Sequence, residues 1–439
     1  MRSPRTANPR RILFQPWPLL AFALILTVTF VRAEDWPQWR GPNRDGKWTA
    51  RGLPETFTEA NLKILWRAPI GGGLSSPIVA GGRVYVTDSL EQKPKAWESI
   101  RCFDEASGAP LWKYTYEADY VLEYAFQPKA RTGPYSTPIV ENGKLYAMGI
   151  MGDVVCLDAL TGSLLWKRKL TKDYELGDSY TTPSLLIEGN LLILVIGGKP
   201  NACVVALDKS SGHETWRALD DQWTYSSPIV IDFGGKRQLI VWTREAVTSL
   251  DPTTGNIFWR EKFTTAYAVV TPVFDRGHLL VGGVMFQLDP QKPGASIIWP
   301  ERRTPSRTLL SQTSLPFLQG DCVFSNRVNG HLVCLDTATG RELWRTDRVT
   351  DQGNAASIHL TPVGDSALLF TDQGNLIRAR LTPQGYEEFG RVHLIEPTYF
   401  IYGRNLIWTP PAYANGHIFA RNDEELICAT LSEEAAPAK

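Results

Sequence analysis

Residues able to do chemistry are thinly spread along this chain of 439 residues. The densest acidic stretch is RNDEE at 421–425. A hard cation needs several convergent oxygen ligands, so a solvated hairpin turn is the expectation for this stretch. The histidines lack the spacing of metal ligands, and most of them are expected on turns and strand surfaces. They are His213, His278, His331, His359, His393 and His417. The residues therefore predict neither a metal site nor a catalytic set.

Aromatic side chains are stronger candidates for binding. Tyr135, Tyr180 and Tyr225 each come just before a small polar pair and a proline, and Tyr267 and Trp408 stand at comparable places. Aromatic residues at repeated positions could surround the mouth of a channel, or they could pack between neighbouring repeats.

A long stretch at 113–135 is a second candidate surface. Its binding candidates are Tyr116, Tyr120, Tyr124, Phe126 and Arg131. Long loops on a rigid scaffold often carry function, and aromatic residues with scattered charge suit a protein partner or a polymer such as a glycan. The alternative is a lid that packs on itself. Residues 91–99 are expected to form another insertion on the same face.

Two repeated phrases specify the architecture. The first is an apolar pair, Asp, a short turn, Gly and Trp, as in CLDALTGSLLW at 156–166. The aspartate accepts bonds from its turn, the glycine supplies a positive φ, and the tryptophan offers a flat apolar face to a neighbouring repeat. The aspartates are Asp104, Asp158, Asp208, Asp251 and Asp336, and the tryptophans are Trp112, Trp166, Trp216, Trp259, Trp299 and Trp344.

The second phrase is a small polar pair and a proline before a β-branched run. Its eight prolines are separated by 61, 45, 45, 44, 44, 46 and 48 residues. Each repeat contains four short strands divided by turn residues. The sequence therefore predicts an all-β, eight-bladed propeller with four-stranded antiparallel blades over residues 61–431. A seven-bladed ring with one irregular repeat is the alternative.

The ring must be closed by its two ends. The eighth repeat has three strands, whereas NLKILWRAP at 61–69 is a lone strand carrying Trp66. We expect residues 62–67 to complete the last blade, which would remove an open sheet edge. The lead-in segment at 34–60 contains DWPQWRGPNRDG, in which Trp36 and Trp39 are expected to pack under the ring and Arg40 to bind turn carbonyls. The alternative is that Trp36 or Trp39 stacks on a ligand.

Residues 1–33 are typical of a secretory signal peptide, with arginines, a 13-residue apolar stretch and a cleavage site after Ala33. An uncleaved anchor is the alternative, and the route, general or twin-arginine, stays open. We expect a periplasmic or extracellular monomer, without a stable membrane span after cleavage and with a disordered tail at 432–439. A net charge of zero argues against nucleic acid as a partner. The cysteines follow the repeat, so buried free thiols are expected.

The two phrases together resemble the pyrroloquinoline quinone (PQQ) repeat family, over about residues 35–430. That family includes quinoprotein alcohol dehydrogenases and BamB-type outer-membrane assembly proteins. The resemblance implies PQQ with calcium as a possible cofactor. The chain lacks the adjacent cysteine pair usual in those dehydrogenases and a C-x-x-C-H haem motif.

A repeat of this kind indicates fold more than function. The leading hypothesis is a non-catalytic interaction or scaffold module in the periplasm or envelope. A quinoprotein alcohol or sugar dehydrogenase with a divergent site and a carbohydrate- or polymer-binding propeller are the alternatives.

Overall fold

The computed structural model describes Met1 and residues 34–92, 95–120, 133–176, 182–262, 264–265, 268–300 and 310–431. The expected signal peptide beyond Met1 and the expected tail at 432–439 lie outside the described residues. Within this part of the chain, no helix has the length and apolar character needed to cross a membrane.

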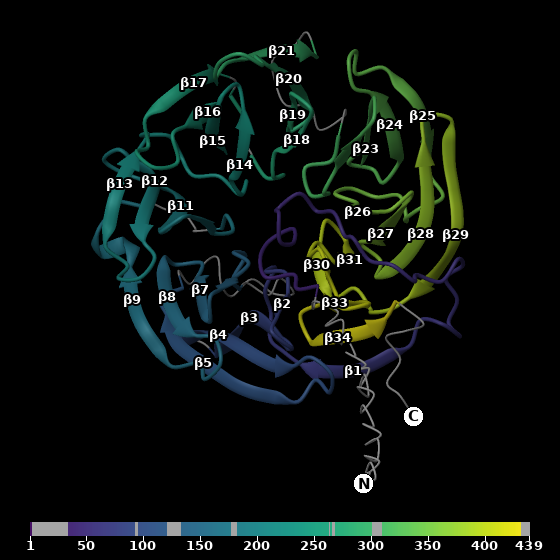
Figure 1. Cartoon of the computed structure of the whole chain (residues 1–439), viewed down its shortest axis with the longest axis horizontal. Coiled ribbons are helices and arrows are strands. Elements are labelled where there is room, and N and C mark those ends of the chain that lie inside the picture. Colours follow the sequence, from purple (N-terminus) through teal and green to yellow (C-terminus); the bar gives the residue numbers. More distant parts are fainter. Residues whose placement is uncertain are drawn as a thin grey trace. The chain divides into compact units, whose positions relative to one another are not determined.

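Eight four-stranded antiparallel sheets are arranged around a central axis (Figure 1), which confirms the predicted eight-bladed propeller. Consecutive strands pair within each of the first seven blades. Blade 1 contains β2 (Ile78–Ala80), β3 (Arg83–Gln92), β4 (Lys95–Asp104) and β5 (Pro110–Ala118), and blade 2 contains β6 (Ile139–Glu141), β7 (Lys144–Met148), β8 (Asp153–Asp158) and β9 (Leu164–Lys169). Blade 3 contains β10 (Leu186–Glu188), β11 (Leu191–Gly198), β12 (Ala202–Asp208) and β13 (Glu214–Ala218), and blade 4 contains β14 (Ile229–Phe233), β15 (Lys236–Trp242), β16 (Ala246–Leu250) and β17 (Ile257–Lys262).

Blades 5 to 7 follow the same order, and blade 8 takes its outer strand from the beginning of the chain. Blade 5 contains β18 (Val273–Asp275), β19 (His278–Val281), β20 (Val284–Leu288) and β21 (Ala295–Trp299), and blade 6 contains β22 (Phe317–Gln319), β23 (Cys322–Asn326), β24 (Leu332–Asp336) and β25 (Glu342–Thr346). Blade 7 contains β26 (Ile358–Val363), β27 (Ser366–Thr371), β28 (Asn375–Thr382) and β29 (Gly385–His393), and blade 8 contains β32 (Ala412–Ala414), β33 (His417–Arg421), β34 (Glu425–Thr430) and β1 (Ile64–Pro69).

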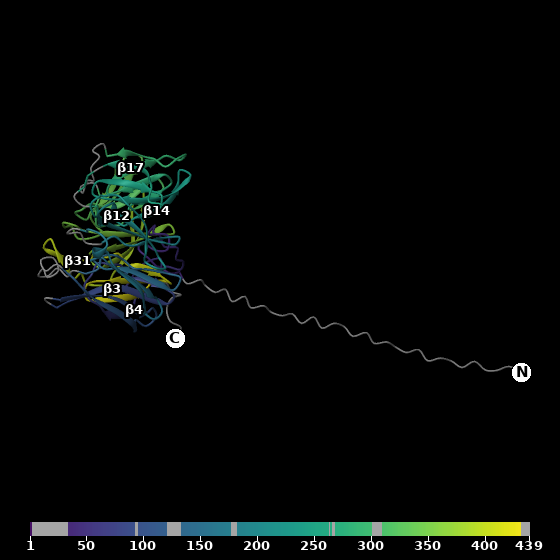
Figure 2. The same cartoon turned by 90° about the vertical axis from the view of Figure 1, so that its left-hand side faces the viewer.

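Two small elements lie outside the blades. A 3-10 turn, η1 (Leu170–Lys172), follows blade 2. A hairpin of β30 (Tyr399–Ile401) and β31 (Arg404–Leu406) lies between blades 7 and 8 in the sequence. Figure 2 views the ring from its edge and shows this hairpin on the left face.

The ring closes as expected. Strand β1 pairs antiparallel with β34, with Trp66 opposite Cys428, so the purple and yellow ends of the propeller meet in one sheet (Figure 1). This pairing gives β34 a partner on both sides and ties residues more than 350 positions apart in the sequence.

The first repeated phrase works as a joint between blades. Asp158 Oδ1 accepts hydrogen bonds from the backbone N–H groups of Leu160 and Thr161, at 3.0 and 2.8 Å. Gly162 has a φ of +73°, and a Cβ there would lie 2.6 Å from the indole of Trp112 in the preceding blade. Trp112 Nε1 donates to the carbonyl of Ala159, at 3.1 Å. Position 162 therefore requires glycine for two reasons, its positive φ and its lack of a Cβ atom.

The same contact recurs around the ring. A Cβ on the phrase glycine would lie within 3.0 Å of the tryptophan of the preceding blade in four further pairs: Gly108 and Trp66, Gly212 and Trp166, Gly255 and Trp216, and Gly340 and Trp299. Trp344 Nε1 donates to the carbonyl of Thr382, at 2.7 Å. Trp259 is different, because its Nε1 donates to Gln238 Oε1 in its own blade, at 2.8 Å.

The lead-in segment crosses the ring and binds the innermost strands. Trp36 exchanges backbone hydrogen bonds of 2.9 Å with Val79 of blade 1, and Arg44 donates to the carbonyls of Leu185 and Pro228 in blades 3 and 4, at 2.6 and 3.0 Å. Trp48 N donates to Pro362 O in blade 7, at 3.0 Å. The lead-in therefore joins blades across the ring.

Side chains of the lead-in also enter the core. Trp36 and Trp48 are 4% and 3% exposed, and both pack on Tyr413 of blade 8, with centroid distances of 5.8 and 5.4 Å. Arg40 Nη2 donates to the carbonyl of Asp45 in its own turn, at 3.0 Å. These contacts have the character of a clasp.

The predicted insertion in blade 1 at 91–99 is present as a long hairpin, because β3 and β4 pair from Arg83 and Asp104 out to Gln92 and Lys95, well beyond the length of β7 and β8. One expectation about the next strand is wrong. Strand β5 continues to Ala118, so Tyr116 belongs to the blade. The extended part has polar residues, and Glu98 is buried there, which is why its composition reads as a loop.

All cysteines are buried and free, as expected: Cys102, Cys156, Cys203, Cys322, Cys334 and Cys428. Burial raises the pKa of the thiols of Cys102 and Cys156 to about 11. A thiol with a raised pKa is a poor nucleophile at neutral pH.

Candidate functional site

The propeller contains a central cavity of about 480 Å³. All eight blades contribute to its wall, as do the β30–β31 hairpin and Trp39 of the lead-in. The cavity therefore lies on the axis of the ring. Its size is in the range of pockets for small molecules.

A single repeat position supplies much of the wall. The residue three places before the phrase proline lines the cavity in six blades: Leu74, Tyr135, Tyr225, Val269, Thr313 and His359. These residues come where each innermost strand begins, and alternation along an extended chain turns every second side chain to one face. Tyr180 has the same place in its repeat but lies outside the described residues, as does Tyr267.

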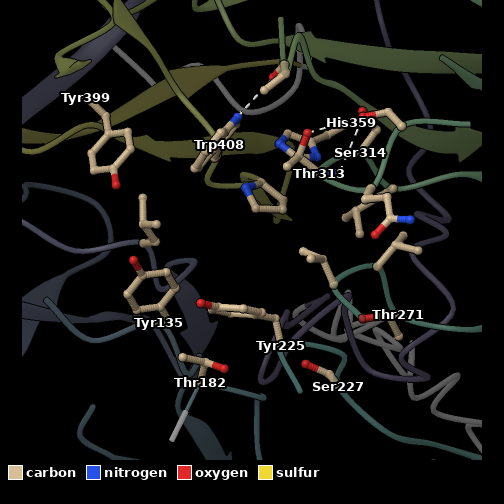
Figure 3. Close-up of a pocket in the computed structure, with 18 of the residues that line it drawn as sticks. Tyr135, Thr182, Tyr225, Ser227, Thr271, Thr313, Ser314, His359, Tyr399 and Trp408 are labelled. Atoms are coloured by element: carbon tan, nitrogen blue, oxygen red, sulfur yellow. Dashed lines mark hydrogen bonds between the residues drawn. The ribbon is translucent and has the colours of Figure 1, made fainter. Parts of the chain in front are cut away.

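Two aromatic groups face the cavity (Figure 3). Tyr135 and Tyr225 form one, with ring centroids 6.2 Å apart. Tyr399 of β30 and Trp408 form the other, with centroids 5.5 Å apart. Trp408 is held by a hydrogen bond of 3.1 Å from Nε1 to the carbonyl of Ala355. Of the predicted ring of aromatics, the structure thus brings Tyr135, Tyr225 and Trp408 to one cavity.

Trp39 contributes to both the clasp and the cavity. Its Nε1 donates to Thr271 Oγ1 of blade 5, at 2.9 Å, and its side chain is part of the cavity wall. Trp36, in contrast, lies in the core. The two interpretations of DWPQWRGPNRDG therefore apply to different residues. Trp36 packs in the core, and only Trp39 of the two lies where a ligand could contact it.

His359 of β26 is an exception to the expectation that histidines lie on turns and strand surfaces. It is 2% exposed, lines the cavity, and neither ring nitrogen has a well-formed hydrogen bond to a described protein group. Burial lowers its pKa to about 4, although the backbone of Trp408 acts in the opposite direction. The imidazole is therefore neutral at pH 7 and presents one donor and one acceptor.

Gln312, in the connection that leads into blade 6, adds a second unpaired polar group. It is 8% exposed, and its Oε1 has no hydrogen-bond partner among the described residues. The amide of Asn354 and several hydroxyl groups also belong to the polar part of the wall. The hydroxyls are those of Thr182, Ser184, Ser227, Thr271, Ser311, Thr313 and Ser314.

The described wall of the cavity contains no Asp, Glu, Lys or Arg. PQQ carries three carboxylates and calcium requires several oxygen ligands, usually including carboxylates. No cluster of three or more His, Cys, Asp or Glu side chains suited to a metal occurs in the described parts of the chain either. These residues do not fit PQQ with calcium.

Two of the predicted candidates at 113–135, Tyr116 and Tyr120, are not among the described residues that line the cavity. Tyr116 and Tyr120 donate their hydroxyls to the two carboxylate oxygens of Glu98, at 2.5 and 2.9 Å. Glu98 is 1% exposed, and burial raises its pKa although the tyrosines and Ile150 N donate to it. The two tyrosines therefore hold the end of blade 1. Tyr124, Phe126 and Arg131 lie outside the described residues.

The prediction that 421–425 forms a solvated hairpin turn is correct for the turn and wrong for the solvation. The stretch spans the β33–β34 turn, but Arg421 and Asp423 are 1% and 4% exposed. Arg421 donates to the carbonyls of Thr87 and Gly71, both at 2.7 Å. These acidic and basic residues join blade 8 to blade 1, so they serve closure of the ring.

Sequence comparisons give two groups of similar proteins. BamB of Xanthomonas campestris, an outer membrane protein assembly factor, is 27% identical over 54% of this chain and 60% of its own. BamB of Moranella endobia is 30% identical over 33% of this chain, and the lanthanide-dependent methanol dehydrogenase of Methylacidiphilum fumariolicum is 25% identical over 46%. The matched region spans 34% of the length of each of these last two proteins.

Solved structures share the fold. BamB from Moraxella catarrhalis superposes with a TM-score of 0.56 at 15% identity, over 84% of this chain and 99% of that one. The quinohemoprotein alcohol dehydrogenase from Comamonas testosteroni gives 0.64 at 13% identity, over 91% and 81%.

A family model settles the relationship within this group. The model described as outer membrane protein assembly factor BamB matches residues 96–266 and 243–385, which together make up more than half of the chain. The chain belongs to this BamB-like family of PQQ-repeat β-propellers.

Proposed function

We propose that this chain is a non-catalytic binding module of the periplasm or envelope, with a protein or polymer partner. The observation that carries the proposal is the described wall of the central cavity, which combines aromatic faces, hydroxyls and amides but contains no Asp, Glu, Lys or Arg. Acid–base catalysis needs groups that exchange protons near the working pH, and the pKa of His359 lies well below it. Such a wall is suited to recognition.

Membership of the BamB-like family supports the same role, because the relatives that name it are assembly factors. The lead-in adds physical support. It binds across the ring and contributes Trp39 to the cavity wall, which makes a rigid scaffold on which a binding surface can be presented.

Exposed leucines on consecutive outer strands favour a protein partner. Leu65, Leu111 and Leu165 come immediately before the phrase tryptophan in blades 8, 1 and 2, and they are 37%, 45% and 49% exposed. Contiguous exposed apolar surface is typical of interaction sites, and these leucines recur at the same place on three neighbouring blades. Thr215 has the same place in blade 3 and is polar and exposed.

Photocrosslinking tests the interaction. A photoreactive amino acid is placed at Leu111 and, as the matched control, at Thr215, and both chains are irradiated in intact envelopes. The proposal expects an adduct of defined mass from position 111 that position 215 does not give. Absence of adducts from both positions counts against a protein partner.

The dehydrogenase alternative has its own test. The chain is incubated with PQQ and either Ca²⁺ or La³⁺, and oxidation of alcohols and sugars is followed with an electron-accepting dye, beside a known quinoprotein. No turnover above the cofactor blank is expected. Turnover that requires PQQ would overturn the non-catalytic assignment.

A further inference from the structure

The central cavity has two kinds of surface that a single ligand would need to match. The tyrosine pair of Tyr135 and Tyr225 and the pair of Tyr399 and Trp408 give flat apolar faces on different parts of the wall (Figure 3). The C–H faces of sugar rings stack on such aromatic groups, while their hydroxyls need hydrogen-bond partners. The seryl and threonyl hydroxyls of the wall can act as both donors and acceptors.

Two buried groups point more specifically to a ligand with hydroxyls. Gln312 Oε1 is an acceptor without a partner, and the neutral ring of His359 offers a donor and an acceptor, also without well-formed bonds to described groups. Buried polar groups are nearly always hydrogen-bonded in folded proteins. A ligand that both donates and accepts would satisfy these atoms together.

The described wall has no charged side chain, and this favours a neutral ligand over a charged one. A carboxylate or phosphate would be removed from water without any cation among the described lining residues, and an ammonium group would find no carboxylate there. Burying an unpaired charge is costly. The volume of about 480 Å³ is in the range that holds small molecules.

We propose that the central cavity binds a neutral polyhydroxylated ligand, such as one or two pyranose rings at the end of a glycan. The aromatic pairs stack on the rings, and Gln312 and His359 bind their hydroxyls. This inference rests on the proposed binding function and names the chemistry of its ligand.

Calorimetric titration tests the site on the chain from residue 34. The probes are maltose, cellobiose and N,N′-diacetylchitobiose, each up to about 10 mM, with glucuronate and glucosamine as charged comparisons. We expect at least one neutral disaccharide to bind and the charged sugars to bind at least about tenfold more weakly.

Variants locate the binding. Gln312→Leu should weaken it about tenfold or more, because it removes one buried hydrogen bond to the ligand. Gln384→Leu is the matched control, since Gln384 is exposed in the turn between β28 and β29. Thermal unfolding of both variants shows that the fold is retained. Loss of an acceptor that has no protein partner should not lower the midpoint of Gln312→Leu.

The outcomes separate the inference from the proposed function. Failure of every neutral sugar to bind, with no PQQ binding, overturns the inference and leaves a non-catalytic module. Sugar binding that is unchanged in Gln312→Leu also overturns it, because the ligand then lies elsewhere. PQQ-dependent oxidation overturns both.

Discussion

The joint between Trp112 and Gly162 yields a sharp prediction about stability. Replacing Gly162 by alanine places an L residue at a φ of +73°, which costs about 1–2 kcal/mol. The new Cβ would also lie 2.6 Å from the indole, and overpacking of a tight contact costs about 1–3 kcal/mol. We expect Gly162→Ala to lower the free energy of unfolding by about 2–5 kcal/mol.

Gly143 provides the matched control. It has a φ of +76° in the turn between β6 and β7, but a Cβ there would meet nothing within 4 Å. Gly143→Ala should therefore lose only the conformational part, about 1–2 kcal/mol. The difference between the two variants isolates the contact between blades.

Urea unfolding measures both losses. Tryptophan fluorescence and far-UV circular dichroism are followed together, since coincident transitions justify a two-state free energy. Equal losses in the two variants would refute the claim that Gly162 is required by the neighbouring indole. A larger loss in Gly143→Ala would do so more strongly.

Three further predictions follow from buried groups. His359 has a pKa of about 4 when folded and about 6.5 when unfolded. Between these pH values the unfolded chain binds more protons than the folded chain, so the free energy of unfolding decreases as the pH is lowered. Lowering the pH from about 7 to about 5 should cost about 2 kcal/mol through this group, and urea titrations of His359→Gln should lack that part of the loss. Arg44→Met removes two bonds to blade carbonyls and should cost about 3 kcal/mol in urea unfolding, whereas the exposed Arg51→Met should cost almost nothing. Thiol titration in denaturant should give six free thiols per chain, and a count near zero would contradict the buried free cysteines.

Local repetition made the fold predictable. The aspartate, glycine and tryptophan of each phrase lie within a dozen residues, and each copy repeats the same turn and the same contact to the neighbouring blade. The partner of β34 was also predictable, because one lone strand with Trp66 and one incomplete blade remained.

The cavity was predictable only in part. Tyr135 and Tyr225 lie three residues before the proline of their repeats, and this position indicated that they face the axis. His359 has the same position in its repeat, so counting back three residues from each proline would have identified His359 as a cavity residue. Residue type concealed it, since the histidines were judged only by their lack of metal-ligand spacing.

Long-range burial could not be predicted from local composition. Arg421 and Asp423 read as a solvated turn, yet Arg421 meets the carbonyl of Thr87, 334 positions away in the sequence. Glu98 is similar, because its burial depends on Tyr116, Tyr120 and the backbone of Ile150 in the next blade.

The central claim is that the cavity recognises neutral ligands and does not hold PQQ with a metal. Thermal unfolding of the chain with and without PQQ plus Ca²⁺ tests it most directly. A ligand present at about 100 times its dissociation constant adds about 2.7 kcal/mol of stability. We expect no shift of the midpoint, whereas a clear upward shift that requires both PQQ and the metal would show that the cavity holds the cofactor.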